Sequence, residues 1–243
     1  MRESYTTTSI LQDCLRESPS PITPATAAQH ISQRLLRNEK DLSNAENNSA
    51  EGYLWQLWRD FFNAAEQTPH DHPGQDRLVQ VIVELQKLPS RRVSVWNLRD
   101  YVLWEELPIL GPSLREAWNA GPRALPGEIE EADAIGWRRL NSFTARLVNA
   151  GILTNTLLGF WSIRDALEET GLSRSGRECS VAAAAEWVVH TQRFFLEDIA
   201  RMEATGEEDR RMAGGALYDG PKRLSGDRWR FWKRRFEELG GQL

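Results

Sequence analysis

Residues 128–152, EIEEADAIGWRRLNSFTARLVNAGI, decide the fold class. Five side chains recur at intervals of three and four, which is the spacing of one helix face: Trp137, Leu140, Thr144, Leu147 and Val148. Acidic residues open the stretch, where they suit the positive end of the helix dipole. Gly151 follows as a plausible C-terminal stop. The stretch therefore predicts one long helix with a buried face.

The same spacing continues toward the C-terminus. We expect a helix near residues 155–169 and another that is capped by Ser180. The face of the second consists of Val181, Ala184, Val188, Phe195, Ile199 and Met202. Residues 206–226 are rich in glycine and read as a loop. Continued helical spacing on both sides of this loop favours a bundle of helices.

The last helix is predicted from Trp229, Trp232, Phe236 and Leu239, which are spaced three, four and three residues apart. Ser225 or Asp227 can cap its start. Seven basic residues and one acidic residue lie between Lys222 and Arg235, so a surface for an anionic partner is the alternative to a structural helix. Because charged helix faces are usually solvated, we favour a structural role for its tryptophans.

The first half of the chain reads as shorter helices. Thr23 and Pro24 suit a helix start, and apolar spacing predicts further helices over residues 54–65 and 78–88. Residues 93–104 contain residue types that favour strands but lack a clean alternation. We therefore expect a short helix over residues 100–106, and a second helix that starts at Pro112.

Residues 1–24 are expected to form a disordered arm, because alternating serine and proline block regular hydrogen bonding. No segment alternates as a strand does, and no sequence repeat has a fixed period. The prediction is an all-α fold, an irregular bundle of about seven or eight helices, which forms a single domain over residues 25–243.

Composition excludes several classes of protein. The chain has 243 residues, a formal net charge of -5 and no apolar run of about 18 residues, so we expect neither a membrane span nor general nucleic-acid binding. Cys14 and Cys179 are the only cysteines, which favours a reducing compartment and a cytoplasmic location. Ten tryptophans predict an aromatic core or an aromatic-lined cavity.

Three polar residues are candidates for catalysis. Glu105 follows Trp104, and a carboxyl group beside tryptophan in an apolar pocket can acquire a raised pKa. Asn141 lies beside the buried stripe of its helix, where it must find hydrogen-bond partners. His190 is spaced to face the core and could act as an acid or base beside a cavity. Surface carboxylates and hydrogen-bonded core histidines are the commoner explanations.

No motif predicts a metal ion or a cofactor. His70 and His72 lie in a proline-flanked loop, and a zinc site needs a fuller set of ligands. The chain also lacks a phosphate-binding loop, a dinucleotide-binding glycine motif and a nucleophile motif. We therefore expect neither a metal nor a cofactor.

Four blocks resemble a large family of fungal helical proteins of unknown function: 103–119, 137–147, 182–190 and 214–236. The last, GGALYDGPKRLSGDRWRFWKRRF, is the most specific. The matching positions include Trp104, Glu105, Pro108, Trp137, Asn141, Trp187, Gly215, Tyr218, Arg228, Trp229 and Trp232. The resemblance covers roughly residues 50–240 and supplies no catalytic residue. Because some relatives are encoded in gene clusters for secondary metabolites, it implies an intracellular accessory protein of small-molecule biosynthesis.

Three functions remain open at this stage. The first is binding of a hydrophobic small molecule among Trp104, Trp137, Trp187 and Tyr218, with or without cofactor-independent cyclase or isomerase chemistry. The second is a non-catalytic protein-interaction module, which requires an exposed apolar patch. The third, an enzyme that uses an aminoacyl-tRNA, requires a continuous basic groove, and the net charge opposes it. The sequence does not decide whether the protein is an enzyme.

Overall fold

The computed structural model describes residues 6–16, 22–42, 50–95, 99–122, 127–154 and 156–240. Contacts divide the chain into two compact units, Met1–Gly121 and Pro122–Leu243. Each unit is built mainly of helices and has its own buried side chains. The two units are therefore described one after the other.

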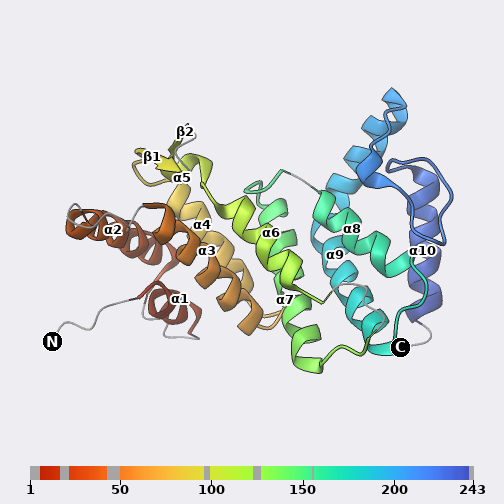
Figure 1. The fold of residues 1–243 in the computed structure, drawn as a ribbon, viewed down its shortest axis with the longest axis horizontal. Coiled ribbons are helices and arrows are strands. Elements are labelled where there is room, and N and C mark those ends of the chain that lie inside the picture. Colours follow the sequence, from red (N-terminus) through yellow and green to blue (C-terminus); the bar gives the residue numbers. More distant parts are fainter. Residues whose placement is uncertain are drawn as a thin grey trace. The chain divides into compact units, whose positions relative to one another are not determined.

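The first unit surrounds a central helix, α3 (Figure 1). Its helices are α1 (Thr7–Leu15), α2 (Pro24–Leu42), α3 (Ala50–Gln67), α4 (Gly74–Gln86), α5 (Leu103–Glu106) and α6 (Leu110–Ala120). Helices α1 and α6 pack on α3, and α2 packs on α4. Trp58 and Phe61 of α3 are fully buried, and the Trp58 indole N–H donates to the Pro108 carbonyl at 2.8 Å. A wide apolar face on α3 thus organises this unit.

Helix α1 corrects the expectation of a disordered arm over residues 1–24. Ile10 and Leu11 are completely buried, and the Thr6 side chain caps the helix by accepting from the Ser9 N–H at 3.1 Å. The serine and proline residues that motivated the expectation follow this helix instead of disrupting it. Residues 1–5 and 17–21 lie outside the described part.

A two-stranded hairpin corrects the expected helix over residues 100–106. Strand β1 (Arg92–Val95) pairs antiparallel with β2 (Arg99–Val102), so that Arg92 lies opposite Val102. Helix α5 begins only at Leu103 and has a single turn. Alternation is visible in β1, where Val93 and Val95 are buried, but four residues are too few to be recognised as a periodic pattern.

The second unit consists of α7 (Glu131–Asn149), α8 (Leu157–Leu167), α9 (Arg174–Thr205), the 3₁₀ turn η1 (Arg210–Met212) and α10 (Gly226–Gly240). Helix α9 lies against α7 and α8, and α10 packs on α8 (Figure 1). Gly151 adopts a φ of 75° just after α7, as expected for a stop that suits glycine. The cap of α9 is Ser173 and not Ser180, because the helix begins two turns earlier than predicted.

The all-α class is confirmed, with the hairpin as the only sheet in the described residues. Those residues form ten α-helices. The sequence analysis expected about seven or eight helices; α1 was not among them, and α5 is the last turn of the short helix expected over residues 100–106. The single-domain organisation over residues 25–243 stays a prediction, because each half of the chain forms a compact unit. No helix in the described part is long and apolar enough to span a membrane.

Candidate functional site

The most specific sequence block folds around one buried carboxylate, Glu168, at the end of α8. Arg228 donates from Nε to Glu168 Oε1 and from Nη2 to Glu168 Oε2, both at 2.7 Å. Neither side chain is exposed. Trp232 donates its indole N–H to the same Oε1 at 2.6 Å. A buried two-point ion pair with further hydrogen bonds is well compensated for its loss of water.

The glycine-rich loop is held by the same pair. The Gly215 N–H donates to Glu168 Oε2 at 2.9 Å, and the Leu217 N–H donates to the Glu168 carbonyl at 2.7 Å. A Cβ at residue 215 would stand 2.7 Å from that carbonyl oxygen, so the approach requires glycine. Arg228 Nη1 also donates to the Met212 carbonyl at 2.8 Å. These contacts give the glycine-rich loop a structural role.

Tyr218, a candidate ligand-binding residue, belongs to this cluster. Its ring lies 4.4 Å from the guanidinium carbon of Arg228 and 5.5 Å from the Phe231 ring centroid. Phe160 contacts the same guanidinium at 4.6 Å. The aromatic rings therefore cover a buried cation through their faces, which is a packing role.

Asn141, a candidate catalytic residue, joins three helices of the second unit. Its amide NH₂ donates to the Trp137 carbonyl at 2.8 Å, and its carbonyl oxygen accepts from the Trp187 indole N–H at 2.8 Å. The Ser162 hydroxyl donates to the same oxygen at 3.2 Å. Asn141, Ser162 and Trp187 are all buried. The structure thus brings Asn141 together with the candidates Trp137 and Trp187 in the core of the second unit.

His190, the candidate acid or base, faces Ser142 and Glu186. Its Nε2 lies 3.5 Å from the Ser142 hydroxyl and 3.6 Å from a Glu186 carboxylate oxygen. A serine–histidine–acid triad needs the serine and the acid on opposite ring nitrogens, whereas here both approach the same one. Ser142 is also completely buried, so no substrate can reach it.

Glu186 is the most strongly perturbed carboxyl group near His190. Burial acts to raise its pKa, but hydrogen bonds from His190, Arg138 and Ser142 and the charge of Arg138 outweigh burial and lower the pKa to about 2. Arg138 Nε donates to Glu186 at 2.8 Å. A carboxylate that stays ionised and paired stabilises the fold but is a poor proton donor.

Trp104 and Glu105 lie in the first unit, whereas the other candidate residues lie in the second. Trp104 is buried and donates its indole N–H to the Ser32 hydroxyl at 3.1 Å. Glu105 is exposed on the single turn of α5. The prediction that Glu105 lies in an apolar pocket is therefore wrong, because consecutive residues of a helix point in different directions.

A hollow between α9 and α10 is a candidate site for a ligand. Its volume is about 340 Å³, and it is lined by Val188, Gln192, Trp229, Trp232, Lys233, Phe236 and Glu237. Of the three aromatic residues, Trp232 is buried and Trp229 and Phe236 are half-buried. Trp229 and Trp232 lie 6.1 Å apart in an edge-to-face arrangement. The apolar face predicted for α10 therefore supplies both core contacts and the wall of a hollow.

The polar groups around this hollow are unused within the described residues. Gln192, Lys233 and Glu237 form no side-chain hydrogen bond or ion pair there, and the indole N–H of Trp229 has no acceptor. By contrast, the indole N–H of Trp232 is bonded to Glu168. Unused donors and acceptors beside an aromatic wall are typical of small-molecule sites.

None of the residues proposed from the sequence as catalytic lines this hollow. The sequence analysis singled out Trp229, Trp232, Lys233 and Phe236 for the terminal helix, but it assigned them no pocket. Val188 belonged to a predicted core face, while Gln192 and Glu237 lacked any signal. The pairing of α9 with α10 was the missing information, since neither helix forms the hollow alone.

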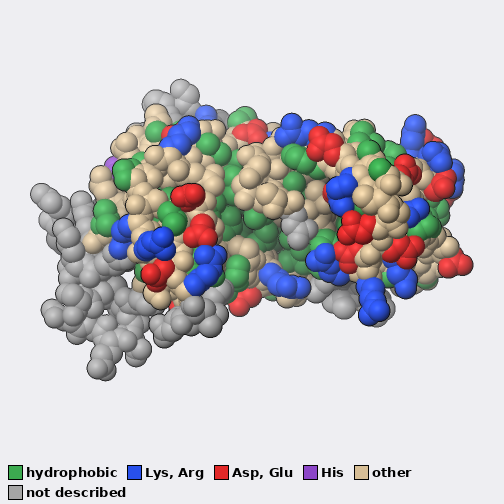
Figure 2. All heavy atoms as spheres, turned by 90° about the horizontal axis from the view of Figure 1, so that it is seen from above, with side chains coloured by type: hydrophobic (Ala, Val, Ile, Leu, Met, Phe, Trp, Pro, Cys, Tyr) green, Lys and Arg blue, Asp and Glu red, His purple; other side chains and the backbone are tan. Residues whose placement is uncertain are grey.

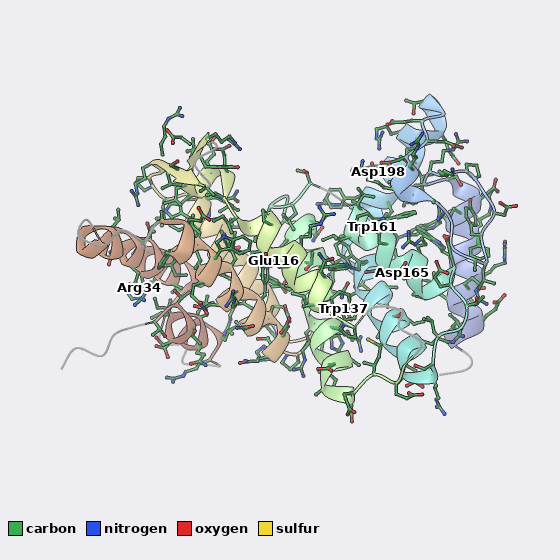
Figure 3. The ribbon with its side chains drawn as sticks, in the orientation of Figure 1. Arg34, Glu116, Trp137, Trp161, Asp165 and Asp198 are labelled. Carbon is green, nitrogen blue, oxygen red and sulfur yellow. The ribbon has the colours of Figure 1, made fainter. Side chains whose placement is uncertain are left out.

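Several other polar side chains in the described chain are hydrogen-bonded within the protein. Figure 3 labels Trp161 on α8 and Asp198 on α9. Trp161 donates to the Arg211 carbonyl at 2.9 Å, and Asp198 accepts from the Thr156 hydroxyl at 2.9 Å. His72 accepts from the Gly74 N–H at 2.9 Å, which is a turn contact. No group of three or more metal-binding side chains gathers among the described residues.

Comparison with protein families identifies the chain as a member of a family described as a protein of unknown function (DUF3632), whose model matches residues 58–236. The match spans the four sequence blocks between residues 103 and 236 and includes most of the residues that line the α9–α10 hollow. No curated protein and no solved structure gives a significant match.

Proposed function

We propose that this protein binds a hydrophobic small molecule in the hollow between α9 and α10. The supporting observation is an aromatic-lined volume of about 340 Å³ bordered by polar groups that have no hydrogen-bond or ion-pair partner among the residues that the structure describes. Small-molecule sites typically have volumes of about 300–1,000 Å³ and combine apolar walls with a few polar groups. The volume of the hollow and the chemistry of its lining residues are therefore both typical of such a site.

Binding is favoured over cyclase or isomerase catalysis. Proton transfer needs an acid or base held within hydrogen-bond reach of the substrate. The polar atoms of Asn141 are bonded within the core, and neither His190 nor Glu105 lines the hollow. The family resemblance suggests that the bound molecule is a secondary metabolite or its precursor, so we propose an accessory role in the cytoplasm.

The proposal is tested with N-phenyl-1-naphthylamine, an uncharged probe whose fluorescence rises in apolar surroundings. Two neighbouring valines of α9 provide a matched pair of variants. Val188 lines the hollow, whereas Val189 is 73% exposed and does not. Val188→Trp should fill the hollow and weaken probe binding at least about tenfold, because one overlapping side chain removes most apolar contacts. Val189→Trp should bind as the unaltered protein does.

Equal probe binding by the two variants would contradict the proposed site. Thermal melts of both variants separate a filled hollow from a misfolded protein, since only misfolding lowers the melting temperature strongly. Phe236→Ala provides a second measurement, because it removes a half-buried wall without adding bulk. Its probe affinity should fall while the protein remains folded.

A protein-interaction module is the second candidate. Val189 and Leu196 are exposed by 73% and 44%, and their spacing of seven residues places them on the same side of α9. Single exposed apolar residues are common, and a docking patch of several hundred Å² would be expected for a partner. Val189→Glu and Leu196→Glu should abolish partner capture, but not probe binding, if this candidate is correct.

The aminoacyl-tRNA alternative has less support. On α10, Arg230 pairs with Asp227 and Arg235 pairs with Glu238, each at 2.5 Å. On the face drawn in Figure 2, basic and acidic side chains are interspersed. A continuous basic groove is the expected electrostatic surface for a nucleic acid. Mixed charges of this kind favour a solvated surface.

A further inference from the structure

Most charged residues at the start and on the other sides of α10 have partners. Arg228 is paired with the buried Glu168, and Arg230 and Arg235 form ion pairs with acids three residues away. Lys233 and Glu237, which line the hollow, are four residues apart but form no ion pair with each other or with any described residue. The two opposite charges at the hollow are thus available to a ligand.

The direction of the two helices fixes the order of groups along the hollow. The Gly226 N–H at the start of α10 donates to Glu203 near the end of α9, at 2.7 Å. Phe195, two turns earlier on α9, lies 6.2 Å from Trp229. The helices therefore run antiparallel. Trp229 lies toward one end of the hollow and Phe236 toward the other, about 10 Å apart along the helix axis.

The positive and negative groups are close enough for one ligand to contact both. Side chains four residues apart on a helix have Cβ atoms about 5–6 Å from each other. We infer that the ligand carries an amine and a carboxylate on one carbon atom, attached to an aromatic or similarly planar group. Lys233 receives the carboxylate, Glu237 receives the ammonium, and the ring lies among Trp229, Trp232 and Phe236.

This head group explains more of the site than a single charge would. A cation alone would suit Glu237 and the aromatic faces but would be repelled by Lys233. An anion alone would suit Lys233 but would be repelled by Glu237. An uncharged ligand would leave both charges unused. The inference rests on the proposed function, since it assigns a ligand class to the same hollow.

Three matched probes test the head group: L-tryptophan, tryptamine and indole-3-propionate. Tryptamine is tryptophan without the carboxylate, and indole-3-propionate is tryptophan without the amine. Ligand-observed NMR titration measures the affinity of each for the full chain. L-tryptophan should bind about three- to fivefold more tightly than either single-charge probe, the size expected for one partly exposed ion pair.

Two variants assign each charge to its residue. Lys233→Gln should reduce the affinity for L-tryptophan about three- to fivefold and leave tryptamine binding no weaker. Glu237→Gln should reduce the affinity for L-tryptophan similarly and leave indole-3-propionate binding no weaker. Arg234→Gln is the control, because Arg234 is an exposed neighbouring cation that does not line the hollow. It should change none of the three affinities.

Equal affinities for the three probes, or tightest binding of a single-charge probe, would overturn the inferred head group. So would the absence of L-tryptophan binding by a protein that still binds N-phenyl-1-naphthylamine. In those cases the hydrophobic site stands and only the ligand class is wrong. Loss of binding of the uncharged probe as well would remove the site itself.

Discussion

Glu168 and Arg228 lie sixty positions apart in the sequence and meet as a two-point ion pair with no exposed surface. The pair joins the end of α8 to the start of α10, and it also holds the loop between them through Gly215 and Met212. The most specific block of the sequence therefore marks a structural joint. Trp232 links this joint to the hollow, because it donates to Glu168 and also lines the ligand site.

Removing the carboxylate should be strongly destabilising. Glu168→Ala leaves the buried Arg228 guanidinium without its counter-charge, which typically costs about 3–5 kcal/mol of the free energy of unfolding. Urea denaturation measures the change. Glu178→Ala is the control, because it removes an exposed ion pair with Arg174. Similar losses in the two variants would show that the buried pair adds nothing to stability.

The terminal helix should depend on its tryptophan and not on its exposed cations. Trp232 is 2% exposed, so Trp232→Ala should cost about 3–5 kcal/mol through loss of packing. Arg230, Lys233 and Arg234 are exposed, and their joint replacement by glutamine should cost far less. Melting curves compare the variants. A greater loss of stability in the triple glutamine variant than in Trp232→Ala would indicate that the basic face, and not the aromatic face, holds the helix in place.

Two helical glycines should respond oppositely to alanine. A Cβ at Gly159 would lie 2.4 Å from the ring of Trp187, whereas a Cβ at Gly136 would meet nothing within 4 Å. Gly159→Ala should therefore displace Trp187 and lower the melting temperature. Gly136→Ala should raise stability by up to about 1 kcal/mol, because alanine is the better helix former. Unchanged stability of the Gly159 variant would contradict the packing around Trp187.

Acid should remove a specific contribution from Glu186. Its pKa falls from an ordinary 4.5 to about 2 in the folded chain. A carboxyl group whose pKa is depressed in the folded state contributes stability at pH values above its unfolded pKa. This contribution is lost as the pH falls through the folded pKa. At about 1.36 kcal/mol per pKa unit, the difference corresponds to about 3 kcal/mol. Urea denaturation between about pH 5 and pH 2 should show that Glu186→Gln loses less of its free energy of unfolding than the unaltered protein does. Equal losses in the two proteins would contradict this prediction.

The helical fold could be predicted because most elements carry a long apolar face. The stripe around Trp137 specifies α7, and the spacing of Trp229, Trp232, Phe236 and Leu239 specifies α10. The hairpin could not be predicted, because its strands have four residues each and their stability depends on pairing. Helix α1 was hidden by the serine and proline residues beside it.

The site was less accessible to sequence reasoning. Asn141 was recognised as a residue in need of partners, but its partners Ser162 and Trp187 come from other helices. Whether a polar residue serves the core or a ligand depends on such distant contacts. Glu168 carried no signal in the sequence, because its burial is created by Arg228 and by the loop that folds over it.

The most direct measurement of the central claim is mass spectrometry of small molecules that co-purify with the protein from cells that produce it naturally. The unaltered protein and Val189→Trp are expected to retain the same hydrophobic molecule, which denaturation releases. Val188→Trp, which fills the α9–α10 hollow, is expected to retain none. A co-purified molecule that persists in folded Val188→Trp, or no such molecule with the unaltered protein, would contradict the proposed function.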